Sequence, residues 1–173
     1  MTSGNAPDPT EQSHWRPWRL LQASMDAEIA RVYTEAQISG LKPSWVMELL
    51  RLHARGPMTI TELARSVQLT HSAVSQKVAA MHAAGWVRTT TGADARSKKV
   101  TLTAKARRIT GRLAAEWRAT EAAIADIEAE IPYPLSQVVT DIAEALQRKS
   151  FHDRIAEKLA SDPAWKEGPG HDR

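Results

Sequence analysis

Cysteine is absent from the 173 residues of this sequence, which excludes disulfide bonds, thiolate metal ligands and thiol-based redox sensing. Long hydrophobic runs are absent too, because a charged residue or a histidine interrupts each apolar stretch before it reaches the roughly 18 residues of a membrane-spanning helix. Phenylalanine occurs once and tyrosine twice, so six tryptophans supply most of the aromatic side chains. These features predict a cytoplasmic protein with no membrane partner.

The sequence also lacks the short motifs that mark common enzymes. It contains no G-x-S-x-G, no G-x-G-x-x-G and no G-x-x-x-x-G-K-[ST], which are the motifs of serine hydrolases, dinucleotide-binding folds and P-loops. Its six histidines form no i, i+4 pair and no H-E-x-x-H helix. We therefore expect no catalytic residues, no cofactor and no metal site.

Positive charge is concentrated in one part of the chain. The whole sequence has a formal net charge of +3, but the segment 70–112 contains nine basic residues and a single acid, Asp94. This segment therefore has a net charge of +8, and the remainder sums to −5. Such segregation predicts a surface that binds a polyanion.

Apolar residues recur three or four positions apart through most of the chain, which predicts a mainly helical fold. The expected helices cover residues 15–39, 44–55, 59–67, 70–84, 104–131 and 135–159. Two β-rich runs, at 86–92 and 98–103, predict one hairpin. The polar ends of the chain predict a disordered tail over 1–13 and a flexible tail over 161–173, on either side of a single domain over 14–160.

A short helix, a tight turn, a second helix and a hairpin follow one another, as in a winged helix-turn-helix. In the second helix, Val74, Val78 and Met81 share one stripe, and the opposite side carries Ser72, Gln76, Ala79 and Ala83, with Ser75 at its margin. A slim polar face suits the DNA major groove, where glutamine pairs with adenine. We expect the long stem of Lys77 to carry its ammonium outward to a phosphate. Each feature alone is common on ordinary surfaces, but their adjacency favours DNA binding.

Residues 59–106 resemble the winged helix-turn-helix of the MarR family of bacterial transcription regulators. The resemblance rests on D-x-R at 94–96, V-x-L-T at 100–103 and G-W-V at 85–87. The chain departs from the family where Lys105 and Ala106 replace the usual glycine. The resemblance implies a mainly α fold, in which a winged helix-turn-helix with a two-stranded β wing (43–104) is flanked by long dimerisation helices (14–39 and 105–160).

The resemblance also implies a function. A two-fold homodimer would bind a pseudo-palindromic operator in double-stranded DNA and act as a repressor. Arg96 matches the wing arginine that enters the minor groove, Asp94 would hold Arg96 or cap the turn, and neighbouring cations would contact phosphates. The residues expected to bind DNA are Thr70, Ser72, Ser75, Gln76, Lys77, Arg88, Asp94, Arg96, Lys98 and Lys99.

A heptad-like apolar seam indicates a partner surface for the long helix. Its members are Ile109, Leu113, Trp117, Thr120, Ile124, Ile127 and Ile131. Two partners remain open, a second copy of the chain or other helices of the same domain.

Members of the family also bind small effectors between the dimerisation helices and the DNA-binding lobe. The residues expected to line a site for a small aromatic effector are Trp15, Trp18, Tyr33, Trp45 and His53. The same side chains are equally compatible with core packing.

Two rival functions stay open as well: a winged helix that binds an acidic protein, and a non-specific architectural DNA binder. Selection from randomised DNA separates both from a regulator, since only a regulator enriches one palindromic motif.

Overall fold

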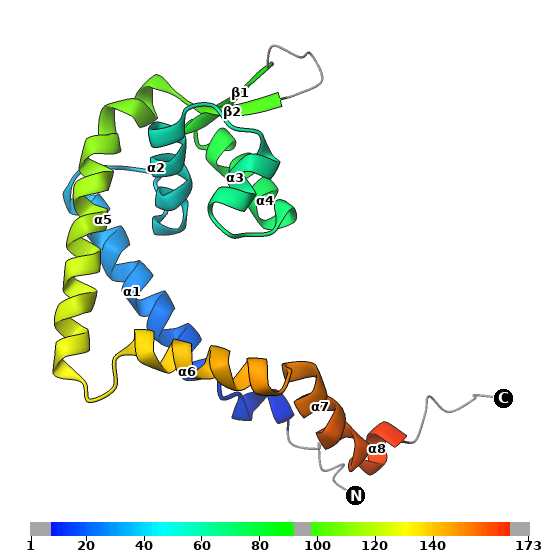
Figure 1. Ribbon diagram of the computed structural model, residues 1–173. Helices are drawn as coiled ribbons and strands as arrows, with labels where there is room; N and C mark the ends of the chain where they lie inside the picture. Colours follow the sequence, from blue (N-terminus) through cyan, green and yellow to red (C-terminus); the bar gives the residue numbers. More distant parts are fainter. Residues whose placement is uncertain (1–7, 92–97, 167–173) are drawn as a thin grey trace, which may run out of the picture. The chain divides into compact units, whose positions relative to one another are not determined.

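The computed structural model describes residues 8–91 and 98–166, and it is mainly helical with one two-stranded sheet (Figure 1). The elements are, in chain order, η1 (Pro9–Gln12), α1 (Arg16–Glu35), η2 (Pro43–Trp45), α2 (Val46–Arg55), α3 (Ile60–Ser66), α4 (His71–Ala83), β1 (Val87–Thr91), β2 (Lys98–Leu102), α5 (Ala104–Glu130), α6 (Leu135–Arg148), α7 (Phe151–Ala160) and α8 (Pro163–Lys166). The predicted fold class, mainly α with a two-stranded wing, is confirmed. The chain divides into two compact units, Met1–Arg118 and Ala119–Arg173.

The helix-turn-helix of the first unit begins at two side-chain caps. The Thr59 backbone N–H donates to the Glu62 carboxylate at 2.7 Å, and the Glu62 N–H donates back to the Thr59 hydroxyl, which is the predicted capping box. Gln68 takes a left-handed φ of 55° in the turn, and the Thr70 hydroxyl then caps α4 by accepting from the Ala73 N–H. The loop chemistry thus fixes where α3 ends and α4 starts.

The hairpin pairs β1 with β2 in antiparallel register, with Val87 opposite Leu102. Gly85 takes a φ of 75° just after α4, so that the chain reverses into β1. Met58, which precedes α3, forms two backbone hydrogen bonds with Val100. Through this isolated bridge, Met58 pairs with β2 at the base of the wing. The sequence pattern does not predict this pairing.

The core of the first unit lies between α2, α3, α4 and the hairpin. Leu49, Leu63, Val74 and Met81 have no exposed surface. Trp86 is 1% exposed, and its indole N–H donates to the Gly40 carbonyl at 2.7 Å. The Lys105 ammonium lies 3.9 Å from the ring centroid of the same tryptophan. One indole therefore joins three segments that are distant in sequence.

Helix α1 ends at Glu35 and not near residue 39 as predicted, because Gln37 takes a left-handed φ of 57°. The Tyr33 hydroxyl donates to Glu116 at 2.8 Å, and the Arg112 guanidinium donates to the Ala36 carbonyl at 2.7 Å. These two bonds attach the end of α1 to α5 within the first unit.

The second unit contains the end of α5 and helices α6 to α8. The prediction of one helix over 135–159 is wrong, since Lys149 is extended and separates α6 from α7. The Ser150 hydroxyl caps α7 by accepting from the Asp153 N–H, and the Arg154 guanidinium donates to the Ala145 carbonyl across the break. Serine and aspartate three residues apart are a local helix-start signal that outweighs the continuing apolar pattern.

The segments near the two ends of the chain contain short helical turns. These turns, η1 and α8, lie within the segments predicted to be tails. The single domain predicted over 14–160 stays a prediction. No described helix combines the length and the apolar character that crossing a membrane requires.

Candidate nucleic-acid interface

Helix α4 separates an apolar side from a polar one. Val74, Val78 and Met81 point into the core, and each is at most 6% exposed. The opposite side is exposed at Ser72, Gln76, Ala79 and Ala83, and Ser75 is half-buried at the margin. The short side chains leave α4 slim on its exposed side, which is the geometry that entry into a groove about 12 Å wide requires.

Thr70 lies at the exposed start of α4, where its hydroxyl is engaged as the helix cap. His71 and Ser72, the first two residues of the helix, are exposed as well, so the positive end of the helix dipole lies at the surface. Such a helix start favours a phosphate nearby. Thr70 therefore stays a predicted DNA contact, and it also caps α4.

Lys77 does not extend toward solvent as predicted. Its ammonium donates to the Glu48 carboxylate and to the Ser44 carbonyl, both at 2.8 Å. Glu48 is completely buried in α2, and burial of that carboxylate draws the lysine stem inward along the apolar surface of α4. In this structure the Lys77 ammonium contacts α2 and η2, and the prediction that it is a free phosphate contact is corrected.

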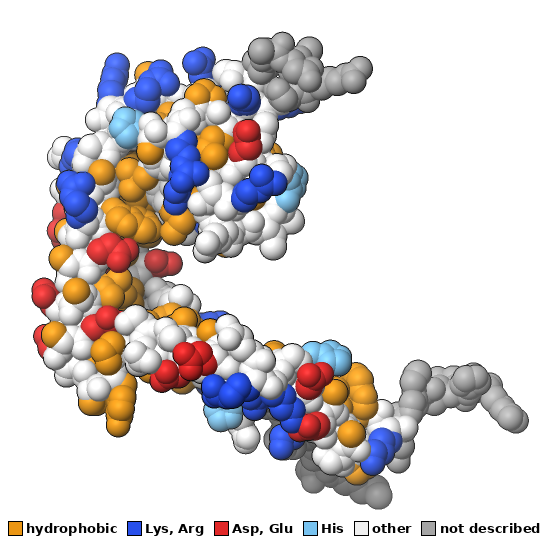
Figure 2. Space-filling model, viewed as in Figure 1, with side chains coloured by type: hydrophobic (Ala, Val, Ile, Leu, Met, Phe, Trp, Pro, Cys, Tyr) orange, Lys and Arg blue, Asp and Glu red, His pale blue; other side chains and the backbone are white. Residues whose placement is uncertain are grey.

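Cationic side chains lie along the two strands of the wing. Arg88 in β1 is exposed, Lys98 in β2 is exposed, and Lys99 is half-buried. Asp94 and Arg96, the residues predicted at the wing tip, lie outside the described residues. Figure 2 shows Lys and Arg side chains on the unit that carries the wing and also on the helices of the other unit. These cations remain predicted phosphate contacts.

The carboxylate of Glu62 is a fixed negative charge near the wing base. Its pKa lies below the usual value, first because the Thr59 backbone N–H and hydroxyl donate to it, and secondarily because Lys99 and Arg65 are close. Glu62 therefore stays ionised and holds its place at the start of α3.

The five residues predicted to line an effector site are placed in different surroundings. Tyr33 and Trp45 are buried in the core, whereas Trp15 is 55% exposed, Trp18 is half-buried and His53 is exposed. The Tyr33 hydroxyl is engaged with Glu116, and burial together with this bond raises its pKa. Core packing, the alternative role of these side chains, accounts for Tyr33 and Trp45.

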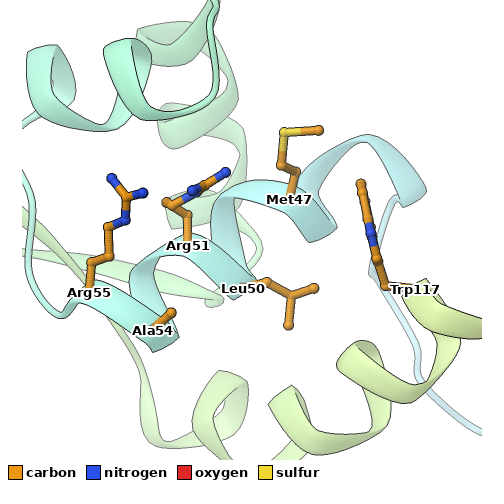
Figure 3. Close-up of a pocket in the computed structure, with 6 residues that line it drawn as sticks. All are labelled: Met47, Leu50, Arg51, Ala54, Arg55 and Trp117. Atoms are coloured by element: carbon orange, nitrogen blue, oxygen red, sulfur yellow. The ribbon is translucent and has the colours of Figure 1, made fainter.

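A different pocket lies between α2 and the middle of α5, at Trp117 (Figure 3). Its lining residues are Met47, Leu50, Arg51, Ala54, Arg55 and Trp117, and its volume is about 260 Å³. Figure 3 shows Arg51 and Arg55 extending from one side of α2, while Leu50 points toward α5. The pocket thus combines an apolar floor with two cations. The sequence signal was the i, i+3, i+4 spacing of the lining residues on the side of α2 opposite Leu49 and Leu52.

Metal-binding side chains do not cluster in the described parts of the chain, where no group of three histidine or acidic residues is arranged to hold an ion. The geometry of this site is that of a binding surface built from a helix, a wing and cations.

The sequence of the winged region matches a known family. Residues 39–97 match the sequence model of the MarR family. The matched stretch, about a third of the chain, is similar to MarR-family proteins. The matched segment begins in the loop before α2 and includes α3 and α4, so the polar side of α4 lies within it. A search of curated protein sequences finds no match to the chain.

Solved structures extend the likeness beyond residues 39–97. The transcriptional regulator MosR of M. tuberculosis, crystallised with DNA, is 25% identical, and the match covers 79% of this chain and 96% of MosR with a TM-score of 0.56. The S. aureus MepR–DNA complex is 14% identical, covering 79% and 97% with a TM-score of 0.57. PcaV of Streptomyces coelicolor, a transcriptional regulator solved with its natural ligand, is 15% identical, covering 84% and 99% with a TM-score of 0.54. The likeness to MepR and PcaV is one of fold.

Proposed function

We propose that this chain is a sequence-specific DNA-binding transcriptional regulator, a repressor that binds a pseudo-palindromic operator in double-stranded DNA as a homodimer. One observation carries the proposal: within the MarR-family segment, α4 buries Val74, Val78 and Met81 and exposes a slim polar side beside a cationic wing. Two neighbours with the same fold, MosR and MepR, were solved in complex with DNA.

Exposed apolar residues support the homodimer. On α6 they recur at the spacing of a single helix side, at Leu135, Val138, Val139, Ile142 and Leu146. Ile127 and Ile131 of the predicted seam are 51% and 42% exposed. Contiguous exposed apolar surface of this kind marks an interaction site, and a second copy gives a closed two-fold assembly.

Selection from a library of randomised DNA duplexes with the full chain tests the proposal. We expect one enriched motif made of two inverted half-sites about one helical turn apart. Enrichment of nothing beyond general affinity would favour the architectural binder. Absence of DNA binding at low salt would favour the protein-interaction module and overturn the proposal.

The α2–α5 pocket supports an effector that is a small aromatic carboxylate. Its apolar floor at Leu50 and Trp117 suits an aromatic ring, and Arg51 and Arg55 suit a carboxylate. Isothermal calorimetry with benzoate and salicylate tests this, with Arg51→Met as the variant expected to weaken binding and Arg148→Met on α6 as the matched control. Equal binding by both variants and the wild type would exclude this pocket.

A further inference from the structure

Glu48 is a charged side chain that α2 places wholly inside the first unit. It is 0% exposed, and one oxygen, Oε1, lies 2.8 Å from the Lys77 ammonium. The other oxygen, Oε2, finds no hydrogen-bond donor among the described residues. Lys77 is therefore the cation on which this buried carboxylate depends.

This pair, in which Glu48 is buried and the Lys77 side chain is 29% exposed, is a poor source of stability, because the desolvation of Glu48 and the partial desolvation of Lys77 offset their attraction. Its effect is geometric. The Lys77 ammonium also donates to the Ser44 carbonyl in η2, so the end of the lysine side chain is held at two points on a segment 29 to 33 residues earlier in the chain. Aliphatic contacts would allow α4 to slide or rotate, whereas two directional bonds oppose both movements.

Lys77 sits between a residue that faces solvent and one that faces the core. Gln76 is exposed on the polar side of α4, and Val78 is 6% exposed in the apolar stripe. Rotation of α4 about its axis changes the direction of Gln76, and base contacts need their donors held within about 0.5 Å of the productive geometry. Whatever fixes Lys77 therefore also fixes the direction of the Gln76 amide.

We propose that Glu48 and Lys77 form a positioning pair, which fixes the rotation of α4 against α2 and thereby sets the sequence discrimination of the DNA-binding side. The inference rests on the proposed function, and it assigns a role in specificity to a residue, Glu48, that has no exposed surface. It also gives Lys77 a role that is different from contact with a phosphate.

The test compares binding of the full chain to two duplexes across a salt titration. One duplex carries the motif selected by the wild type, and the other carries that motif with one base pair exchanged in each half-site. The variants are Glu48→Gln, Lys77→Met and the double substitution. Lys98→Met on the wing is the matched control, because it removes an exposed cation that is expected to contact a phosphate.

We expect Glu48→Gln and Lys77→Met to reduce discrimination between the two duplexes by about tenfold, with the salt slope unchanged. Lys98→Met should lower affinity for both duplexes alike and reduce the salt slope by about one for each phosphate that the lysine neutralises in the wild type. If Lys77→Met behaves like Lys98→Met, or if Glu48→Gln keeps full discrimination, the positioning role is overturned.

The double substitution separates positioning from folding. It leaves no unpaired carboxylate in the core, so the melting temperature should recover toward that of the wild type, relative to Lys77→Met. Discrimination should stay about tenfold reduced, because no ion pair then holds α4. If the melting temperature and the discrimination between duplexes both recovered, the pair would only support the fold. If the wild type selects no motif, the proposed function itself fails, and this inference fails with it.

Discussion

At the residue scale, the Thr59–Glu62 capping box makes a measurable contribution to the start of α3. Thr59→Ala removes the hydroxyl that accepts from the Glu62 N–H, and we expect the free energy of unfolding to fall by about 1 kcal/mol at pH 7. Urea denaturation provides the measurement. Thr61→Ala, an exposed threonine in the same helix, is the matched control and should change the stability by less than about 0.5 kcal/mol.

The Thr59–Glu62 capping box also predicts that the stability of the fold depends on pH. The folded protein holds the pKa of Glu62 below its ordinary value of 4.5, so the ionised carboxylate stabilises the fold above that pH. This stabilisation is lost as the pH falls below 4.5 and through the lower folded pKa. The difference between wild type and Thr59→Ala should therefore shrink between pH 5 and pH 3. A constant difference over that range would show that Glu62 does not take part.

Tyr33 provides a second prediction at this scale. Tyr33→Phe keeps the buried ring but removes the donor to Glu116, so we expect a loss of about 1 kcal/mol in the free energy of unfolding. Burial and this bond raise the pKa of Tyr33, so its contribution is present below the unfolded value of 10.0 and is lost as the pH rises above it.

The wild type should accordingly lose more stability than Tyr33→Phe when the pH is raised from 9 to 11. Tyr133→Phe, at a site that is 76% exposed, is the control. It should change neither the free energy of unfolding at pH 7 nor the stability lost between pH 9 and pH 11. A Tyr33→Phe variant as stable as the wild type at pH 7 would mean that the hydroxyl contributes nothing net.

At the scale of elements, α4 and the wing carry separate expectations. Gln76→Ala should relax preference at one base position in each half-site and cost about 1–3 kcal/mol there, while affinity for unrelated duplexes stays nearly the same. Binding to a set of single-base variants of the selected motif measures this. A uniform loss across all sequences would instead make Gln76 a backbone contact.

The wing prediction concerns Arg96 and Lys98. Arg96→Ala should weaken binding most when A·T pairs flank the motif, because the narrow minor groove of such flanks concentrates negative potential. Lys98→Ala should weaken binding equally for A·T and G·C flanks. Two duplexes that differ only in their flanks provide the comparison. A flank effect for Lys98→Ala but not for Arg96→Ala would require a different docking of the wing.

The sequence predicted those elements whose signals are local. The caps at Thr59 and Thr70 and the left-handed Gly85 are short-range chemistry, and all three are in place. The break between α6 and α7 was missed because apolar spacing was given more weight than the cap at Ser150. Local patterns describe single helices well and say little about where they are interrupted.

Pairs that are distant in sequence were beyond such patterns. Lys77 lies 29 residues from Glu48, and no periodicity indicates that a lysine on the margin of one helix turns inward to a carboxylate on another. The pocket was missed for a similar reason, since Trp117 and Leu50 come together only when α5 packs on α2. Tertiary packing decided both features.

At the scale of the whole molecule, the expected assembly is a homodimer. Val139 is 57% exposed on the apolar side of α6, so Val139→Asp should leave the monomer fold intact but weaken dimerisation, since a carboxylate buried in an apolar interface costs several kcal/mol. Light scattering at micromolar concentration measures the assembly, and DNA affinity should fall in parallel. Gln147→Asp, on a polar exposed position of the same helix, is the control. A monomeric wild type would contradict the prediction.

The unequal burial of the tryptophans has a spectroscopic consequence. Trp45 and Trp86 are 6% and 1% exposed in the winged core, whereas Trp15 and Trp165 are 55% and 67% exposed. Buried indoles fluoresce at shorter wavelengths than hydrated ones, and a soluble quencher such as acrylamide reaches only the latter. In the presence of the quencher, the remaining blue emission comes chiefly from the core around α2 and the wing base. Its loss during denaturation follows the opening of the core that holds Trp45 and Trp86, without any added label.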